Sequence, residues 1–129
     1  MFSQEALPVL QECEARGIEV HIAGAFRMGV IEEEGGDEIK AKFGVSPESA
    51  ARERWAELAA KHGVALPAVA LAWAFAPACV TKIVLGVATP AHVEENVASL
   101  QATADVPPAL WAEAAEMGLL DAACPLPGR

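Results

Sequence analysis

Apolar residues recur at helical spacing over much of the chain, and turn-forming residues separate the segments in which they do so. In residues 4–16 the apolar positions repeat every three or four residues, Ser3 can cap the start and Gly17 supplies a stop. The segment 67–76 is apolar on all sides, which predicts a helix enclosed by other elements. The predicted helices cover residues 4–16, 46–62, 67–76 and 108–117, and one more begins at Thr89-Pro90.

Two short segments rich in β-branched residues lie between these helices. The first is "IEVHIAGAF", residues 18–26, and the second is "VTKIVLG", residues 80–86, which has the apolar pattern of a parallel strand covered on both faces. The resulting order is helix, strand, helix, helix, strand, helix, helix. It predicts an α/β fold in which right-handed helical crossovers join parallel strands. Residues 27–47 are acidic, contain Gly35-Gly36 and show no period, so they are predicted to form a loop.

Two strands alone do not make a stable sheet, because each one leaves an unpaired edge. Either the helices wrap the pair more completely than the sequence indicates, or another chain supplies neighbouring strands. We favour the second interpretation. We therefore expect a partner that covers the strand edges, either a different protein chain or another copy in a homo-oligomer.

Several predicted helices carry an apolar face that we expect to point into the core. In the helix that follows Pro90, the residues Val93, Val97 and Leu100 recur at the spacing of one helix face and are expected to face inward. The three tryptophans lie on apolar helix faces and are expected to fill the core or an interface: Trp55, Trp73 and Trp111.

Length and composition fit one globular domain spanning residues 1–129, since 53% of the residues are hydrophobic and 21% are charged. The 18 Asp and Glu residues outnumber the 9 Lys and Arg residues. The net charge of −9 repels phosphate backbones and anionic lipids, so nucleic acid is not an expected partner. Pro67, Pro77 and Lys82 interrupt the most apolar stretch, which favours a buried helix and strand over direct membrane insertion.

The cysteines and histidines indicate no metal site. Cys13, Cys79 and Cys124 are far apart and odd in number, so reduced thiols are expected in place of a disulfide framework or a zinc site. His21 and His62 have no metal-ligand spacing around them, and "EEEGGDE" lacks the ligand spacing of a calcium loop. No targeting segment is visible, so we expect a reducing compartment, the cytoplasm by default.

The segment "GVATPAHVEENV", residues 86–97, carries the strongest candidate chemistry. Gly86 lets the backbone approach a ligand, and the N-terminus of the next helix offers free N–H groups and a positive dipole to a phosphate. The alternative is a strand, a tight turn and a helix capped by Thr89, which is a combination common in α/β proteins. Both interpretations stay open from the residues alone.

A resemblance covers nearly the whole chain, and three stretches carry it: "ARGIEVHIAGAFRMGVI", "KHGVALPAVALAWAFAPACVTKIVLG" and "LWAEAAEMGLLDAACPLP". They resemble the seventh strand and its loop, the seventh helical unit with the eighth strand, and the tail of an aldo-keto reductase, with Gly24, Phe26 and Gly29 in register. The sugar-dehydrogenase branch, which oxidises aldoses such as fucose, is especially similar. The resemblance implies a partial (β/α)8 TIM barrel that contains only the last two strand-helix units plus a C-terminal helix.

The resemblance implies that residues 86–97 hold the adenosine end of a nicotinamide cofactor. Gly86 and Thr89 would line the phosphate side, and His92 occupies a position often held by a basic residue. Glu95 and Asn96 match the family pair that hydrogen-bonds the amino edge of adenine.

The nicotinamide end would lie at the first strand. Ala23 stands where the family often has an aromatic residue that stacks on nicotinamide, and Gly24 and Phe26 would belong to the loop beside it. Ala88 replaces the Arg of many relatives, so a 2′-phosphate would meet only His92, which is mostly neutral at about pH 7. The resemblance therefore implies NAD or NADP, with NAD favoured, and a chain that binds no cofactor is the alternative.

The catalytic groups of the family fall outside this sequence. Its hydride transfer depends on a tyrosine acid supported by Lys, Asp and His from earlier barrel strands, and this chain contains no tyrosine. Without that acid a carbonyl oxygen has no positioned proton donor. We expect a non-catalytic remnant that acts as an interaction or structural subunit of a larger assembly. The alternative is one piece of an NAD(P)-dependent reductase or aldose dehydrogenase whose catalytic strands come from another chain or a longer gene product.

Overall fold

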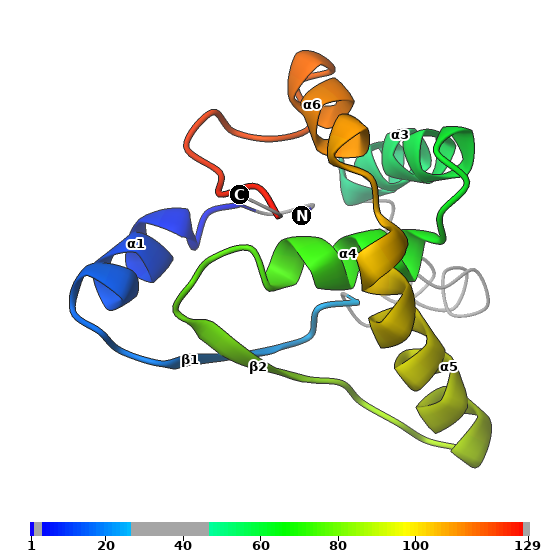
Figure 1. The fold of residues 1–129 in the computed structure, drawn as a ribbon, viewed down its shortest axis with the longest axis horizontal. Coiled ribbons are helices and arrows are strands. Elements are labelled where there is room, and N and C mark those ends of the chain that lie inside the picture. The colour runs from blue at the N-terminus through cyan, green and yellow to red at the C-terminus, as the bar shows by residue number, and fades with distance from the viewer. Residues whose placement is uncertain (2–3, 27–46, 128–129) are drawn as a thin grey trace.

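The computed structural model describes residues 1, 4–26 and 47–127, and its elements follow the predicted order (Figure 1). Predictions that concern residues 27–46, and the cap predicted at Ser3, lie outside the described residues. The elements are α1 (Leu7–Ala15), β1 (Val20–Ala23), α3 (Pro47–Lys61), α4 (Leu66–Ala74), β2 (Val80–Val84), α5 (Pro90–Gln101), the 3₁₀ turn η1 (Ala102–Asp105) and α6 (Pro108–Glu116).

The strands β1 and β2 form a two-stranded parallel sheet. Val20 pairs with Val80 and Ala23 pairs with Val84, with an irregularity in the register directly after Val20. Within the described residues each strand has one edge without a neighbouring strand. This arrangement confirms the prediction of two parallel strands linked through helices.

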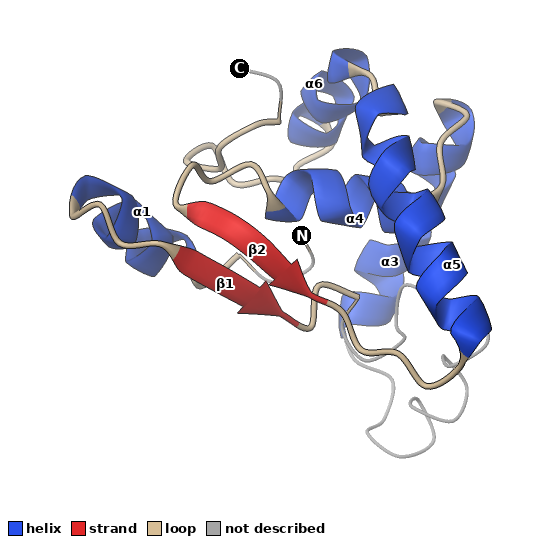
Figure 2. Cartoon of the chain, turned by 60° about the horizontal axis from the view of Figure 1, so that its bottom comes forward, coloured by secondary structure: helices blue, strands red, loops and turns tan. Residues whose placement is uncertain are grey.

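Helices cover mainly one face of this sheet (Figure 2). Val20 and Ile22 are half-buried and line a pocket beside α1 and α4, whereas His21 and Ala23 are exposed. On β2 only Val80 is buried, so the prediction of a strand covered on both faces is wrong. The physical reason is that the described helices pack on one side of the strands and leave the other side to solvent.

The hydrophobic core lies between α3, α4 and α6. Trp55 and Trp111 are 1% and 2% exposed, and their ring centroids lie 6.3 Å apart with an interplanar angle of 59°. Ala68 and Val69 on α4 are fully buried, which confirms the prediction of an enclosed helix. No helix among the described residues is long and apolar enough to span a membrane.

Three polar side chains tie the end of α3 to α6 at the edge of this core. Lys61 Nζ lies 2.5 Å from Glu113 Oε1, and His62 Nε2 lies 3.0 Å from Glu113 Oε2. The hydrogen bond from Lys61, followed by that from His62, holds the pKa of the Glu113 carboxyl below its ordinary value of 4.5.

We expect this cluster to make stability depend on pH in the acidic range. Because the Glu113 pKa is lower in the folded chain than in the unfolded chain, the unfolded chain binds more protons between the two pKa values, and stability rises with pH there. The contribution is complete above 4.5 and is lost as the pH falls through the folded pKa. Urea unfolding at a series of acidic pH values should give a shallower pH slope for Glu113→Gln. Glu116→Gln, an exposed change on the same helix, is the control and should keep the original slope.

Helix α5 turns its polar side toward the rest of the chain. None of its residues is buried, and the three residues expected to face inward are 47%, 49% and 48% exposed; these residues, Val93, Val97 and Leu100, are called the α5 stripe below. The least exposed side chains of α5 are Asn96 and Ser99, which are half-buried. Helix α5 packs mainly against α4. The expectation is therefore wrong, because the described chain places no strand or helix over the α5 stripe.

Candidate functional site

The turn between β2 and α5 hydrogen-bonds largely to itself. Thr89 caps α5, since its Oγ1 accepts a hydrogen bond from the backbone N–H of His92 at 3.3 Å. The His92 ring folds back, and its Nδ1 accepts a hydrogen bond from the backbone N–H of Ala88 at 3.3 Å. Pro90, the first helical residue, has no N–H to donate. Two of the donors that we expected to meet a phosphate are therefore already engaged within the turn.

We expect Thr89→Ala to loosen the start of α5. Losing the side-chain acceptor leaves the His92 amide without its cap, which costs about 1 kcal/mol in typical helices. Amide hydrogen exchange should become faster in the first turn of α5, while exchange in α3 stays unchanged. Thr89→Ser keeps the hydroxyl and serves as the matched control. Equal exchange in both variants would contradict the capping role.

The predicted adenine pair lies along α5. Glu95 is exposed and Asn96 is half-buried. Consecutive helical residues point about 100° apart, so these two side chains flank one edge of α5, between solvent and the side that faces α4. No Lys or Arg occurs in the sequence between Lys82 and Arg129, so this region supplies no guanidinium or ammonium group for a phosphate.

The predicted nicotinamide end lies where β1 ends. Gly24 directly follows β1 and has a φ of +74°, a left-handed conformation that favours glycine. Gly86 follows β2 at the same end of the sheet. The parallel strands therefore bring Gly24 and Gly86 to the carboxyl-terminal end of the sheet. Phe26 is half-buried, and its ring packs against the hydrophobic core.

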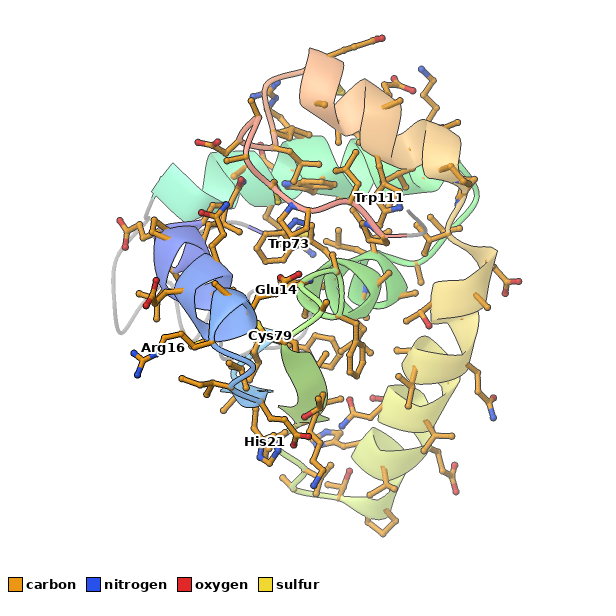
Figure 3. The ribbon with its side chains drawn as sticks, turned by 60° about the vertical axis from the view of Figure 1, so that its left-hand side comes forward. Glu14, Arg16, His21, Trp73, Cys79 and Trp111 are labelled. Atoms are coloured by element: carbon orange, nitrogen blue, oxygen red, sulfur yellow. The ribbon has the colours of Figure 1, made fainter. Side chains whose placement is uncertain are left out.

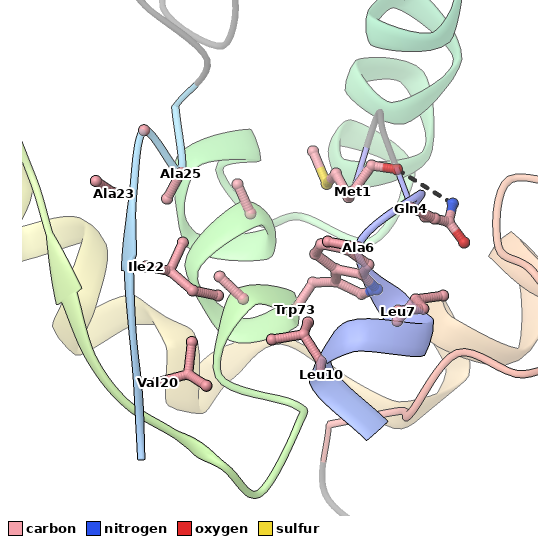
Figure 4. Close-up of a pocket in the computed structure, with 13 residues that line it drawn as sticks. Met1, Gln4, Ala6, Leu7, Leu10, Val20, Ile22, Ala23, Ala25 and Trp73 are labelled. Atoms are coloured by element: carbon pink, nitrogen blue, oxygen red, sulfur yellow. Dashed lines mark hydrogen bonds between the residues drawn. The ribbon is translucent and has the colours of Figure 1, made fainter. Parts of the chain in front are cut away.

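Ala23 and Gly24 line a pocket of about 430 Å³ between α1, β1 and α4 (Figure 4). Most of its wall consists of small or apolar side chains, and Trp73 contributes the one aromatic ring among the described lining residues. Trp73 is half-buried and packs against the hydrophobic core, which agrees with the expectation that it fills the core or an interface. The sequence did contain a signal for this pocket, because the small residues Ala70 and Ala74 lie near Trp73 on α4 and leave room beside its ring.

The polar groups of this pocket already have partners. Gln4 Nε2 donates to the carbonyl oxygen of Leu119 at 2.9 Å, and Trp73 Nε1 donates to Cys124 Sγ at 3.0 Å. Burial raises the pKa of the Cys124 thiol, and the bond from Trp73 opposes this only in part. Among the described residues no buried side-chain N or O atom lacks a hydrogen-bond partner. The pocket therefore offers apolar contact and shape, with little free hydrogen-bonding capacity.

The eight predicted cofactor residues belong to two parts of the fold. Ala23 and Gly24 line the pocket at the end of β1, and Phe26 follows them along the chain. The other five lie in the turn after β2 or on α5: Gly86, Thr89, His92, Glu95 and Asn96. Among the described residues, the two side chains predicted for the adenine end therefore lie on one element. Within the same part of the chain no group of three or more His, Cys, Asp or Glu residues is placed to hold a metal ion.

Comparison with known proteins gives one match. The model of the aldo/keto reductase family matches residues 1–108, a span that includes both strands and extends to the first residue of α6. The match concerns the family as a whole and does not distinguish its branches. No curated protein and no solved structure matches the chain.

Proposed function

Because the chain belongs to the aldo/keto reductase family, we propose that it is a non-catalytic member that acts as an interaction or structural subunit of a larger assembly. Its two parallel strands and their helices are consistent with a fragment of the family's barrel. The resemblance makes a tyrosine the proton donor of the family, and this chain has no tyrosine. A carbonyl oxygen gaining negative charge would therefore lack that acid.

The observation that carries this proposal is the α5 stripe. Helix α5 contacts α4 while its valines and leucine stay about half exposed. A surface helix normally buries its apolar side, so this arrangement supports a partner surface over the stripe. The open strand edges support the same conclusion, since exposed edges are sites where another chain adds.

The energy available from such a contact is sizeable for this chain. Full burial of one Val or Leu side chain contributes about 1.5–3 kcal/mol, so covering the exposed halves of three of them contributes on the order of 2–4 kcal/mol. Pairing of a strand edge with a strand of the partner would add main-chain hydrogen bonds and would fix the orientation of the two chains relative to each other. The partner that fits is another protein chain, or a second copy of this chain, with an apolar surface and a free strand edge.

We propose that any remaining nucleotide recognition is limited to the adenine end and favours NAD over NADP. Glu95 and Asn96 stay on α5 with one exposed and one half-buried side chain. The lack of Lys and Arg after Lys82, up to Arg129, disfavours a 2′-phosphate. The Thr89 hydroxyl and the His92 ring are engaged with the backbone, which disfavours a tight phosphate contact at this turn.

Sedimentation equilibrium of the purified chain, combined with an activity assay, tests the proposed function. We expect association that increases with concentration and no oxidation of aldoses in the presence of NAD or NADP. Tryptophan fluorescence during titration with each cofactor reports binding in the same samples. Turnover by the chain alone would contradict the proposal, and a stable monomer at all concentrations would exclude a second copy of this chain as the partner.

A second candidate is one piece of an NAD(P)-dependent aldo/keto reductase whose catalytic strands come from another chain or a longer gene product. The position of Gly24 and Gly86 at the C-terminal ends of the two strands favours this second candidate, because the family's site lies at the C-terminal ends of the barrel strands. Mixing the chain with its partner separates the two candidates: this one requires aldose oxidation by the mixture, and the first requires none.

A further inference from the structure

Cys79, in the turn that leads into β2, packs against α1, the helix that carries Cys13. Cys79 lies just before β2, and its Sγ donates a hydrogen bond to the carbonyl oxygen of Leu10 over 3.4 Å. Cys79 is 7% exposed, and Cys13 on α1 is half-buried. Figure 3 shows Cys79 and Glu14 close together where α1 meets this turn.

The geometry of α1 directs the Cys13 thiol toward the same carbonyl. Leu10 and Cys13 are three positions apart on one helix face, and helical side chains lean toward the helix N-terminus. By this rule the Cys13 side chain lies on the side of α1 that carries the Leu10 carbonyl, and the Cys79 thiol is hydrogen-bonded to that carbonyl. A disulfide between the two cysteines requires their Cα atoms to come within about 7 Å.

The electrostatic surroundings of Cys79 agree with this placement. Burial is the main cause that raises the pKa of the Cys79 thiol, and the nearby Glu14 and Cys13 raise it further. Leu10, Cys13 and Glu14 share one face of α1, so these electrostatic neighbours agree with the hydrogen bond that places the Cys79 sulfur against that face.

Few non-covalent contacts hold α1 in place. Leu7 is its one buried residue, and the most extensive packing between elements involves β1 with β2 and the helices α3 to α6. A covalent bond from Cys13 to Cys79 would therefore fasten the most weakly attached helix to the turn before β2.

We propose that Cys13 and Cys79 are a redox-sensitive pair that closes to a disulfide when a low-molecular-weight disulfide, such as oxidised glutathione, is the oxidant. The Cys13 thiolate attacks one glutathione sulfur, so a Cys13–glutathione bond forms, the original S–S bond breaks and one glutathione leaves as its thiolate. The Cys79 thiolate then attacks the Cys13 sulfur and displaces the second glutathione. Two protein thiols are oxidised, one glutathione disulfide is reduced to two thiols, and the two protons lost by the cysteines pass to the glutathione thiolates.

Access sets the order of the two steps. Cys13 is partly exposed and can meet the oxidant, whereas Cys79 is buried and reacts only with a sulfur delivered to it. Cys124 provides an internal control, because it is also buried and its Sγ accepts a hydrogen bond from Trp73 in another part of the chain.

The test is to incubate the full chain in glutathione buffers of increasing oxidised fraction, alkylate the remaining thiols and map the peptides without reduction. We expect a peptide pair joining Cys13 to Cys79 to form at least about tenfold faster than any bond to Cys124, and Cys124→Ser should leave this result unchanged. Cys13→Ser should abolish the bond. Cys79→Ala should stop the reaction at the Cys13–glutathione stage.

Hydrogen exchange on the unmodified sequence keeps the test independent of whether the variants fold. Oxidation should slow exchange of the α1 amides in the wild-type chain and should have no such effect in Cys13→Ser. A first bond to Cys124, a bond between two chains, or a lasting Cys13–glutathione adduct in the wild-type chain would each overturn the proposal.

Discussion

Replacing Trp111 with alanine should lower the free energy of unfolding by about 3–5 kcal/mol, the usual cost of deleting a large buried aromatic side chain. Trp111 is 2% exposed and packs against Trp55 at the centre of the contact between α3 and α6. A small domain has a total stability of roughly 5–15 kcal/mol, so this single change would remove a large share of it. Urea unfolding followed by far-UV circular dichroism measures the loss.

Two further variants calibrate the Trp111 result. Trp111→Phe keeps an aromatic ring and leaves a smaller cavity, so it should be clearly less destabilising than alanine. Val9→Ala changes a side chain that is 64% exposed and should stay within about 0.5 kcal/mol of wild type. If Trp111→Ala unfolded at the same urea concentration as Val9→Ala, the tryptophan contact would not be what holds α3 and α6 together.

Changing Val97 to glutamate should weaken association strongly and leave the fold of the chain intact. Val97 lies in the middle of the α5 stripe and is 49% exposed, so a carboxylate there can point into solvent in the free chain. Against an apolar partner surface the same carboxylate would have to be desolvated. We expect the dissociation constant to rise at least about 100-fold, which corresponds to about 2.8 kcal/mol. Sedimentation equilibrium measures the association, and thermal unfolding checks the fold.

Ala98→Glu is the matched control for Val97→Glu. Ala98 is exposed on the same helix but lies outside the α5 stripe, and the substitution changes the net charge by the same amount. It should leave the dissociation constant nearly unchanged. Equal weakening by both variants would attribute the effect to overall charge, and an unchanged constant for Val97→Glu would contradict a contact through the stripe.

The order of the elements could be predicted because each of them carries its own local signal. Alternating helical and β-branched segments, separated by residues such as Gly17, Gly63 and Pro77, are enough to place the helices and both strands. Thr89-Pro90 marks the start of α5 in the sequence, and the structure places the cap there. The enclosed helix α4 could likewise be recognised, because it has no polar face.

The packing of α5 could not be predicted from the same signals. Periodicity shows that Val93, Val97 and Leu100 share a face, but it does not show whether the rest of the chain provides a surface for that face. The bonds of Thr89 and His92 to the turn are also hidden, because the sequence pattern is the same whether the N–H groups meet a ligand or a side chain. The contacts of Glu113 with Lys61 and His62 depend on how distant helices pack, which no local pattern specifies.

The parallel pairing of β1 with β2 also determines when the sheet can form. Val20 and Val80 are neighbours in space although 60 positions separate them in the sequence, so no short hairpin can bring the strands together. At a synthesis rate of about 5–20 residues per second, β1 emerges from the ribosome roughly 3–12 s before β2. During that interval β2, the strand that pairs with β1 among the described residues, is not yet available. Sheet closure is therefore a late event, and helix formation is not the slow step.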